Sequence, residues 1–440
     1  MAEFKVNWQN FSIFTVGSII DLVMKFHFVS VYKQVPAEDL ESFQSWTWQL
    51  QNALKTRDDF ASNFTLTSNE YEAFNESDSD NNTGNSAAGK STGKTIFNIR
   101  ATPYYTKIAS NTEHDPIRKI LMPTSLELTN SIGNHLDPLG EKKNNPVPRI
   151  IHRYSDRVLF LVTDICSVYC RYCTRKHFTG QEQAFIKPDQ MAQALQYIQS
   201  HPGIREVILS GGDPLTLGDA QLEKVLSSLR QIEHVEIIRI GSRMPVVCPM
   251  RITPSLVAMI RKYKPVFMMT HFNHPKEITA EAAEALELMV DHGIPVMNQA
   301  VLLNGINNHP AIIQALSRRL LYLRVKPYYL FQCDPSEGTD HLRTSVDETL
   351  AIQKELWGHL SGLAMPHFTL DIPAGGGKVG LAPNFELEQN STFRKYKGWD
   401  GIEASYMNPQ TTKILPADVA EYLPEWEILK SARAGLAKNL

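Results

Sequence analysis

The chain has 440 residues, five cysteines and a formal net charge of -3, with 42% hydrophobic and 21% charged residues. This composition is that of a globular protein and excludes disordered, collagen-like and coiled-coil classes. The near-neutral charge gives no electrostatic reason to expect nucleic acid or an anionic membrane as a partner. The length predicts two or three domains, although an α/β barrel can absorb most of such a chain as one unit.

The first forty residues show no clear targeting signal. The apolar stretch 13–32 is interrupted by Asp21, Lys25 and His27, so it lacks the unbroken apolar run of a membrane span. The basic start and small-residue cleavage site of a signal peptide are not evident either. We therefore expect residues 1–40 to be a soluble extension of unknown role in a cytoplasmic protein.

Residues 41–147 are predicted to form a helical N-terminal region. Apolar residues at helical spacing predict a helix over Glu38–Leu54. The polar, small-residue stretch 75–95 predicts a mobile loop. Within it, Gly84 to Ser91 fit G-x-x-x-x-G-K-S, the pattern of a phosphate-binding loop. That loop needs a buried strand before it and a helix after it, and because the flanking residues suit neither, we interpret the match as chance.

From Val158 onward, short apolar runs alternate with segments of helical periodicity. Repeated alternation implies parallel strands joined by right-handed crossovers. Six units predict an α/β fold, a partial (β/α)6 barrel over residues 148–365, followed by a C-terminal segment over 366–440. The expected strands are Val158–Thr163, Glu206–Ser210, Glu236–Gly241, Pro265–His271, Pro295–Leu302 and Lys326–Gln332, with a seventh short run at His367–Ile372. The expected helices are Pro188–Ser200, Asp219–Gln231, Pro254–Tyr263, Ala280–His292, Ala311–Leu323 and Val346–Leu360.

Three cysteines follow the first of these strands. Cys166, Cys170 and Cys173 have the spacing C-x3-C-x2-C, and a loop of this length can bend three thiolates toward one point. Three ligands leave one position open, on a zinc ion or on one iron of a four-iron cluster. Zinc sites usually come as paired C-x2-C units, whereas Cys248 and Cys333 stand alone as expected core residues. The pattern thus favours an iron-sulfur cluster over a zinc-stabilised loop, in a reducing compartment.

This spacing resembles the signature of the radical S-adenosylmethionine (SAM) enzymes. The resemblance implies a [4Fe-4S] cluster whose open iron binds SAM and generates a 5′-deoxyadenosyl radical. Gly211, Gly212 and Asp213 follow the second strand, where this family contacts the methionine amino group. Glycines would allow close backbone approach to a ligand there. The alternative for this motif is an ordinary turn between a strand and a helix.

A second glycine-rich motif, P-A-G-G-G-K-V, ends in Lys378. The glycines would let a flat ring approach the amine, and lysines form Schiff bases with pyridoxal phosphate. Taken alone, the motif is more typical of an exposed turn. Over about Trp46 to Pro409, however, the chain resembles the lysine 2,3-aminomutase family. The runs that carry this resemblance include HRYSDRVLFLVT from His152, CSVYCRYCTRKHF from Cys166, SGGDPL from Ser210, PYYLFQCD from Pro327 and DIPAGGGK from Asp371.

The resemblance assigns cofactor roles to individual residues. It implies that Lys378 holds pyridoxal phosphate and that Arg153 and Arg157 bind its phosphate, for which guanidinium geometry is well suited. His271 and Gln299 take positions near SAM. Surface ion pairing is the alternative for the arginines, and for His271 it is an ordinary buried histidine.

The resemblance also points to the substrate. Arg175 stands where the family holds the substrate α-carboxylate, and Asp334 and Asp371 where it binds the distal ammonium of lysine. Two buried acids repel each other unless a cation lies between them, which disfavours glutamate and leaves arginine as an alternative. Phe331 replaces a tyrosine of the family.

The implied enzyme is an isomerase, a pyridoxal phosphate-dependent 2,3-aminomutase that converts L-lysine to β-lysine. Its implied partners are an electron donor such as flavodoxin or ferredoxin and further copies of itself in a homo-oligomer. The rival hypotheses are the same reaction on arginine or another cationic amino acid, a radical SAM enzyme without pyridoxal phosphate, and a non-catalytic protein that binds a cluster or zinc.

Overall fold

A computed structural model describes residues 26–82, 96–129, 133–409 and 415–437 of the chain. Its centre is a nine-stranded sheet in which the strands follow chain order from β1 to β9. Strands β2 to β8 are parallel neighbours, whereas β1 and β9 are antiparallel edge strands. The strands are β1 Ile150–Tyr154, β2 Arg157–Thr163, β3 Glu206–Gly211, β4 Ile237–Gly241, β5 Val266–Thr270, β6 Val296–Leu302, β7 Lys326–Gln332, β8 His367–Ile372 and β9 Gly377–Gly380.

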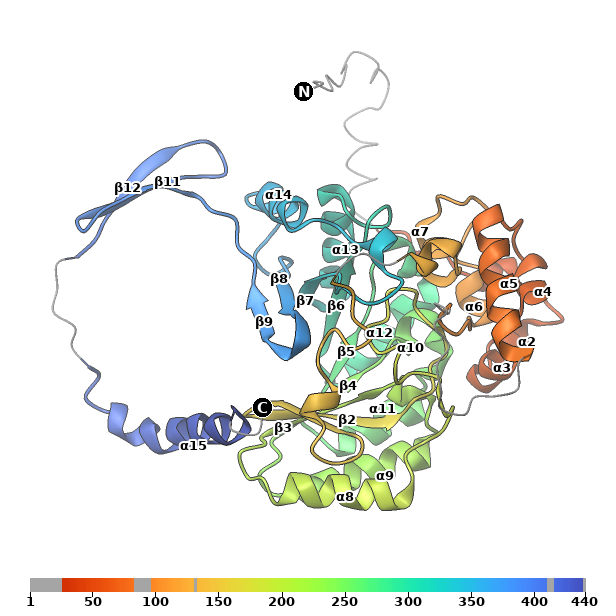
Figure 1. The fold of residues 1–440 in the computed structure, drawn as a ribbon, viewed down its shortest axis with the longest axis horizontal. Coiled ribbons are helices and arrows are strands. Elements are labelled where there is room, and N and C mark those ends of the chain that lie inside the picture. Colours follow the sequence, from red (N-terminus) through yellow and green to blue (C-terminus); the bar gives the residue numbers. More distant parts are fainter. Residues whose placement is uncertain (1–25, 83–95, 130–132, 410–414, 438–440) are drawn as a thin grey trace, which may run out of the picture.

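Long helices connect the parallel strands and lie outside the curve of the sheet (Figure 1). They are α8 Pro188–Gln199, α9 Asp219–Arg230, α11 Pro254–Lys262, α12 Ala280–Asp291, α13 Pro310–Tyr322 and α14 Val346–Leu356. Three of them, α8, α11 and α13, begin with proline. Proline is favoured at this position because the first N–H groups of a helix have no partner within the helix. The predicted alternation and the open partial barrel are confirmed, with boundaries within a few residues.

The main core lies between this sheet and its helices. Alternate residues of β2, Val158, Phe160 and Val162, are buried against the helix layer together with Leu209 of β3 and Leu226 of α9. The opposite faces of the strands line the inside of the curve. Loops at the carboxyl ends of the parallel strands are therefore carried by a rigid frame.

The N-terminal region consists of short helices that cover one side of the barrel. The predicted helix Glu38–Leu54 is wrong as a single element, because Ser45 interrupts it and caps the second of two short helices. The predicted loop from 75 is wrong up to residue 82: a helix continues through that stretch, anchored by Phe74 against Phe60 at 5.4 Å between ring centroids. Residues 83–95, with the G-x-x-x-x-G-K-S match, lie outside the described part. The helices are α2 Leu40–Phe43, α3 Trp46–Gln51, α4 Arg57–Ala61, α5 Ser68–Asn82, α6 Pro103–Thr106 and α7 Pro116–Leu121.

Short elements occupy the connections. These are α10 Met244–Val247 and the 3-10 helices η2 Tyr32–Gln34, η3 Ser125–Leu128, η4 Lys142–Asn144, η5 Pro214–Thr216, η6 Pro249–Arg251, η7 Pro275–Glu277, η8 Asp340–Leu342 and η9 Pro373–Gly375.

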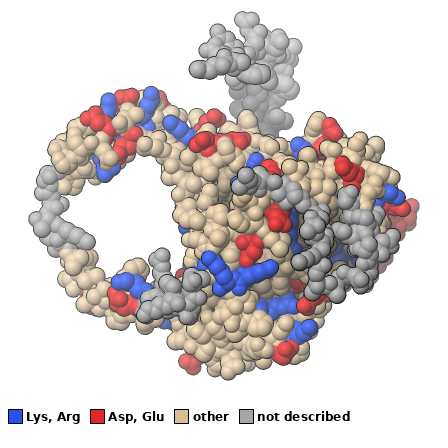
Figure 2. All heavy atoms as spheres, viewed as in Figure 1, with Lys and Arg blue, Asp and Glu red and all other residues tan. Residues whose placement is uncertain are grey.

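The C-terminal segment forms a separate antiparallel sheet and a helix that sequence periodicity did not reveal. The sheet comprises β10 Glu386–Gln389, β11 Phe393–Lys397 and β12 Glu403–Met407, and the helix is α15 Val419–Ala437. The helix stands off the barrel (Figure 1), whereas the segment of the small sheet approaches the end of α14, with 5.3 Å between the ring centroids of Trp399 and His359. In the described ranges, no helix has the length and apolar character needed to cross a membrane. Lysine, arginine and acidic side chains are scattered over the face in Figure 2, and neither sign dominates it.

Candidate active site at the carboxyl ends of the strands

The cysteine loop follows β2 and is tied down by a buried ion pair. Arg171, within the loop, donates to both carboxylate oxygens of Glu127 at 2.7 and 2.6 Å, and neither side chain reaches solvent. Its Nη1 donates to the backbone carbonyl of Asn98, and its Nη2 also donates to that of Phe97. The loop therefore has a fixed path between the N-terminal region and the barrel.

The glycine pair after β3 lies against the start of this loop. The backbone N–H of Gly212 donates to the Thr163 carbonyl, and that of Asp213 donates to the Ile165 carbonyl, both at 2.7 Å. A Cβ atom on Gly211 or Gly212 would collide with these carbonyls. The glycines allow this close approach to the chain's own backbone, which fixes the position of Asp213 beside the cysteine loop, and their role in binding a ligand stays a prediction.

Asp213 also connects two strands. Its carboxylate accepts from the Ser242 hydroxyl at 2.7 Å, from the Arg243 backbone N–H at 2.7 Å and from the Leu215 backbone N–H at 3.0 Å. Burial raises its pKa, and these hydrogen bonds oppose that rise. The end of β3 is thereby joined to the residues that follow β4.

The three cysteines are partly buried, and their thiols lie close enough to affect one another's ionisation. Burial raises the pKa of Cys166 well above its usual value, and Asp213 and the other two cysteines raise it further. Burial and Cys170 likewise raise the pKa of Cys173. Within the described ranges, no group of three His, Cys, Asp or Glu side chains is placed to hold a single metal ion. The donor set fits an iron-sulfur cluster, whose positive irons would favour the thiolate forms that burial disfavours.

His271 lies just beyond β5 with its ring stacked on Tyr172, 5.6 Å between centroids and 14° between planes. Its Nε2 is buried without a hydrogen-bond partner. Burial, and then Arg243, lowers the pKa of His271 to about 3, so the ring is neutral. An unpartnered ring nitrogen beside the cysteine loop suits a polar ligand such as SAM. Gln299 lies half-buried on β6, opposite Tyr329 of β7.

Lys378 lies on the edge strand β9, directly opposite Asp371 of β8. Its Nζ is 3.3 Å from Asp371 Oδ2, while Nη2 of Arg153 is 3.6 Å from Oδ1 of the same carboxylate. The Lys378 Nζ also lies 5.3 Å from the centroid of the Phe331 ring. The Lys378 backbone N–H donates to the Tyr154 hydroxyl of β1 at 3.2 Å, which links the two edges of the sheet.

The surroundings of Lys378 fit pyridoxal phosphate. The Nε of Arg153 is buried without a partner, and its Nη2 has the long ion pair with Asp371 but no hydrogen bond, which suits a phosphate acceptor. Arg157 lies differently: its Nη1 is 2.6 Å from Asp156 Oδ1 and its guanidinium stacks 3.9 Å from the centroid of the Tyr154 ring. A phosphate role for Arg157 stays a prediction.

Asp334 belongs to the same cluster. Burial, and then Asp371, raise its pKa, Lys378 and Arg153 oppose the rise, and the net pKa is about 7. A raised pKa indicates that the surroundings disfavour the ionised form of the carboxylate. The structure therefore brings together the two acids, the lysine and one of the two arginines that were expected to share a site.

Arg175 is engaged by a residue that sequence reasoning missed. Its Nε donates to both oxygens of Glu141, at 2.8 and 3.0 Å, and its Nη1 donates to the Ser210 hydroxyl at 3.0 Å. These bonds orient the guanidinium, and its second terminal nitrogen has donors left for a carboxylate. Glu141 lies in an irregular segment before η4, where no periodic signal marks it.

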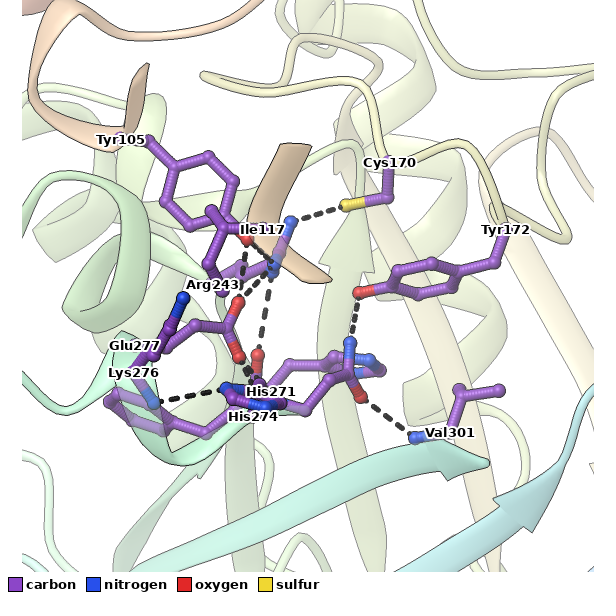
Figure 3. Close-up of polar contacts among 12 residues, drawn as sticks. Tyr105, Ile117, Cys170, Tyr172, Arg243, His271, His274, Lys276, Glu277 and Val301 are labelled. Atoms are coloured by element: carbon purple, nitrogen blue, oxygen red, sulfur yellow. Dashed lines mark hydrogen bonds and ion pairs between the residues drawn. The ribbon is translucent and has the colours of Figure 1, made fainter. Parts of the chain in front are cut away.

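Arg243 is a second missed residue. Its Nη1 donates to the sulfur of Cys170 at 2.8 Å, and its Nη2 is 2.6 Å from Glu277 Oε1 (Figure 3). It stands in G-S-R directly after an expected strand. A charged residue at the carboxyl end of a buried parallel strand is a signal that could have found it.

Comparison with known proteins agrees with this geometry. The family model described as "Radical SAM superfamily" matches residues 160–314, and the model described as "Lysine-2,3-aminomutase" matches residues 353–436. The L-lysine 2,3-aminomutase of Clostridium subterminale is 42% identical over 380 residues, which cover 86% of this chain and 87% of the relative. That of Bacillus subtilis (strain 168) is 42% identical over 383 residues, covering 87% and 77%. The glutamate 2,3-aminomutase of Clostridioides difficile (strain 630) is 39% identical over 362 residues, covering 82% of each.

Proposed function

Since the chain belongs to the lysine 2,3-aminomutase family of radical SAM enzymes, we propose that it acts on L-lysine and moves the α-amino group to C3, giving β-lysine. Membership makes it an isomerase whose cofactors are a [4Fe-4S] cluster, SAM and pyridoxal phosphate. When bound, SAM on the cluster supplies the radical, and pyridoxal phosphate supplies the ring that delocalises it. The protein's own residues choose and orient the amino acid.

The observation that carries the choice of substrate is the pair of acids at the site. Asp371 already contacts Lys378 and Arg153, whereas the pKa of Asp334 remains raised to about 7. A cation added between the two acids would favour the ionised form of Asp334. The distal ammonium of lysine supplies that cation, and the distal carboxylate of glutamate would add a third negative charge.

The opposite end of the substrate is assigned to Arg175. Its guanidinium is oriented by Glu141 and lies next to Ser210 at the end of β3. Charged groups at both ends would fix the amino acid along the site and hold its C3 in one position. Fixed orientation of this kind accounts for much of the rate gain in enzymes.

The test is a product assay under strict anoxia with reconstituted enzyme, SAM, pyridoxal phosphate and a reductant. Lysine, arginine and glutamate are supplied separately, and products are read by NMR. We expect β-lysine from lysine. β-Arginine as the only product would move the proposal to arginine, for which the same two acids offer a cation site. No β-amino acid from any of the three, with the cluster intact and deoxyadenosine released, would refute it.

A matched pair of variants tests the residue assignment. Asp334→Asn should raise KM for lysine by at least about tenfold, because a hydrogen bond between charged groups is worth about 1.5–3 kcal/mol. Asp347→Asn changes an exposed acid in the first turn of α14 and should leave KM unchanged. Equal KM values in the two variants would remove Asp334 from the substrate site.

We also propose that the enzyme works as a homo-oligomer in the cytoplasm and takes its electron from a flavodoxin or ferredoxin. The first point is supported by large apolar side chains exposed on the β10–β12 sheet and its turns, including Trp399, Ile402, Tyr406 and Met407, because exposed apolar patches usually mark interaction sites. The thiols of the cysteine loop suit a reducing compartment. Light scattering on the full chain tests the oligomer, and a monomer at micromolar concentration would contradict it.

A further inference from the structure

Arg243 is positioned far more tightly than an ordinary ion pair requires. It follows β4, and its side chain is 10% exposed against a fully buried Glu277. Its Nη2 contacts Glu277 Oε1 at 2.6 Å and the Tyr105 hydroxyl at 2.7 Å, and its backbone N–H is held by Asp213. Figure 3 shows the guanidinium enclosed between Tyr105, Glu277 and Cys170.

The supporting groups are themselves fixed. The second oxygen of Glu277 accepts from the backbone N–H groups of Asn273 and His274, at 2.5 and 2.9 Å. The Tyr105 hydroxyl donates to the first oxygen at 2.7 Å. Glu277 therefore cannot swing away, and the guanidinium retains one orientation.

That orientation aims a charged donor at a cysteine sulfur. The Arg243 Nη1 lies 2.8 Å from the Cys170 Sγ. A structural ion pair with Glu277 accounts for Nη2 but not for Nη1. Hydrogen bonds to cluster sulfurs and nearby positive charge stabilise the more negative, reduced cluster and so raise its reduction potential.

We propose that Arg243 is a positioning residue that holds the Cys170 thiolate and raises the reduction potential of the cluster bound by the cysteine loop. The inference rests on the family's iron-sulfur cluster and not on the identity of the amino acid substrate. Its test requires no turnover, so its failure is distinguishable from failure of the lysine proposal.

The experiment is a redox titration of the reconstituted full-length enzyme, without SAM or substrate, in which the one-electron reduced cluster is counted by EPR. Arg243→Gln removes the charge and keeps a polar side chain. At the midpoint potential of the wild type, we expect its reduced-to-oxidised ratio to fall about tenfold, which for a one-electron couple is about 59 mV. Arg243→Lys should recover part of the loss, because it restores the charge without the fixed fork.

Arg251 supplies the matched control. It is more deeply buried than Arg243 and donates to the carbonyls of Leu215 and Leu217, with Asp219 as its ion-pair partner. Arg251→Gln removes a buried guanidinium away from the cysteine loop and should leave the potential unchanged. An equal fall in this control would show a general packing effect and overturn the proposal.

Iron and sulfide content, measured for each variant, separates redox tuning from cluster loss. An unchanged potential in Arg243→Gln with full cluster content would overturn the proposal. If that variant fails to hold a cluster, Tyr105→Phe decides, because it removes one support of the guanidinium and keeps the arginine. A lowered potential in Tyr105→Phe supports the proposal, and an unchanged one refutes it.

Discussion

Replacing Asp334 by asparagine should stabilise the folded protein while impairing the site. Burial and Asp371 raise the pKa of Asp334 from 3.8 to about 7. Each pKa unit corresponds to about 1.36 kcal/mol, so the ionised carboxylate costs folding about 4 kcal/mol at pH 8. Asparagine cannot ionise and avoids this cost.

The effect has a defined pH dependence. Because the folded-state pKa lies above the unfolded one, the cost is complete above pH 7 and fades as pH falls toward 4. The stabilisation by Asp334→Asn should therefore shrink to less than half at pH 5 and vanish below pH 4.

Thermal unfolding of the cluster-loaded enzyme without lysine measures this effect. For a chain of this length unfolding as one unit, about 4 kcal/mol corresponds to a rise in Tm of about 4 °C at pH 8. Asp347→Asn, on the surface of α14, should change Tm little at any pH. A rise in Tm that is equal at pH 8 and pH 5, or no rise at either, would refute the reasoning.

Three further substitutions test other parts of the site. Gly211→Ala places a Cβ on a backbone at φ +126 against a carbonyl oxygen. It should lower the unfolding free energy by more than about 3 kcal/mol and remove most of the bound iron. Gly362→Ala, in open space, is the control, and normal iron content in Gly211→Ala would contradict the packing argument. Lys378→Ala should lose the visible absorbance of bound pyridoxal phosphate while its iron and sulfide stay at wild-type levels, and retention of that absorbance would remove Lys378 from this role. Glu127→Gln leaves the buried Arg171 without its counter-ion. Denaturant titration should show that it lowers the unfolding free energy by about 3–5 kcal/mol. A change under about 1 kcal/mol would show that the pair does not anchor the cysteine loop.

The barrel was predictable because its signals are local. Runs such as Val158–Thr163 are apolar on both faces, and proline or threonine marks the start of most of the helices between them. β1 was missed because its sequence, IIHRY, carries polar residues toward the site and has no helix between it and β2. The break at Ser45 was missed because the apolar periodicity continues across it, and the only local sign of a new helix is one capping residue.

The site divides in the same way. Cysteine spacing and the lysine after three glycines are readable from the sequence, and the resemblance supplied roles for the acids and arginines. The partners Glu141 and Arg243 come from segments far away along the chain, and only the fold brings them to Arg175 and Cys170. Contacts of this kind depend on packing and leave no local pattern.

A contact made by a side chain joins the two edge strands β1 and β9. These edges share no backbone ladder, and the Tyr154 hydroxyl meets the Lys378 amide across them. Opening the seam between these edges to a phosphorylated ring would therefore break contacts of side chains and leave the backbone hydrogen bonds between the parallel strands intact. The cysteine loop is fastened elsewhere, to β3 and the N-terminal helices. Different contacts thus hold the cysteine loop and Lys378, so we expect an enzyme that has lost its cluster to keep the contacts around Lys378.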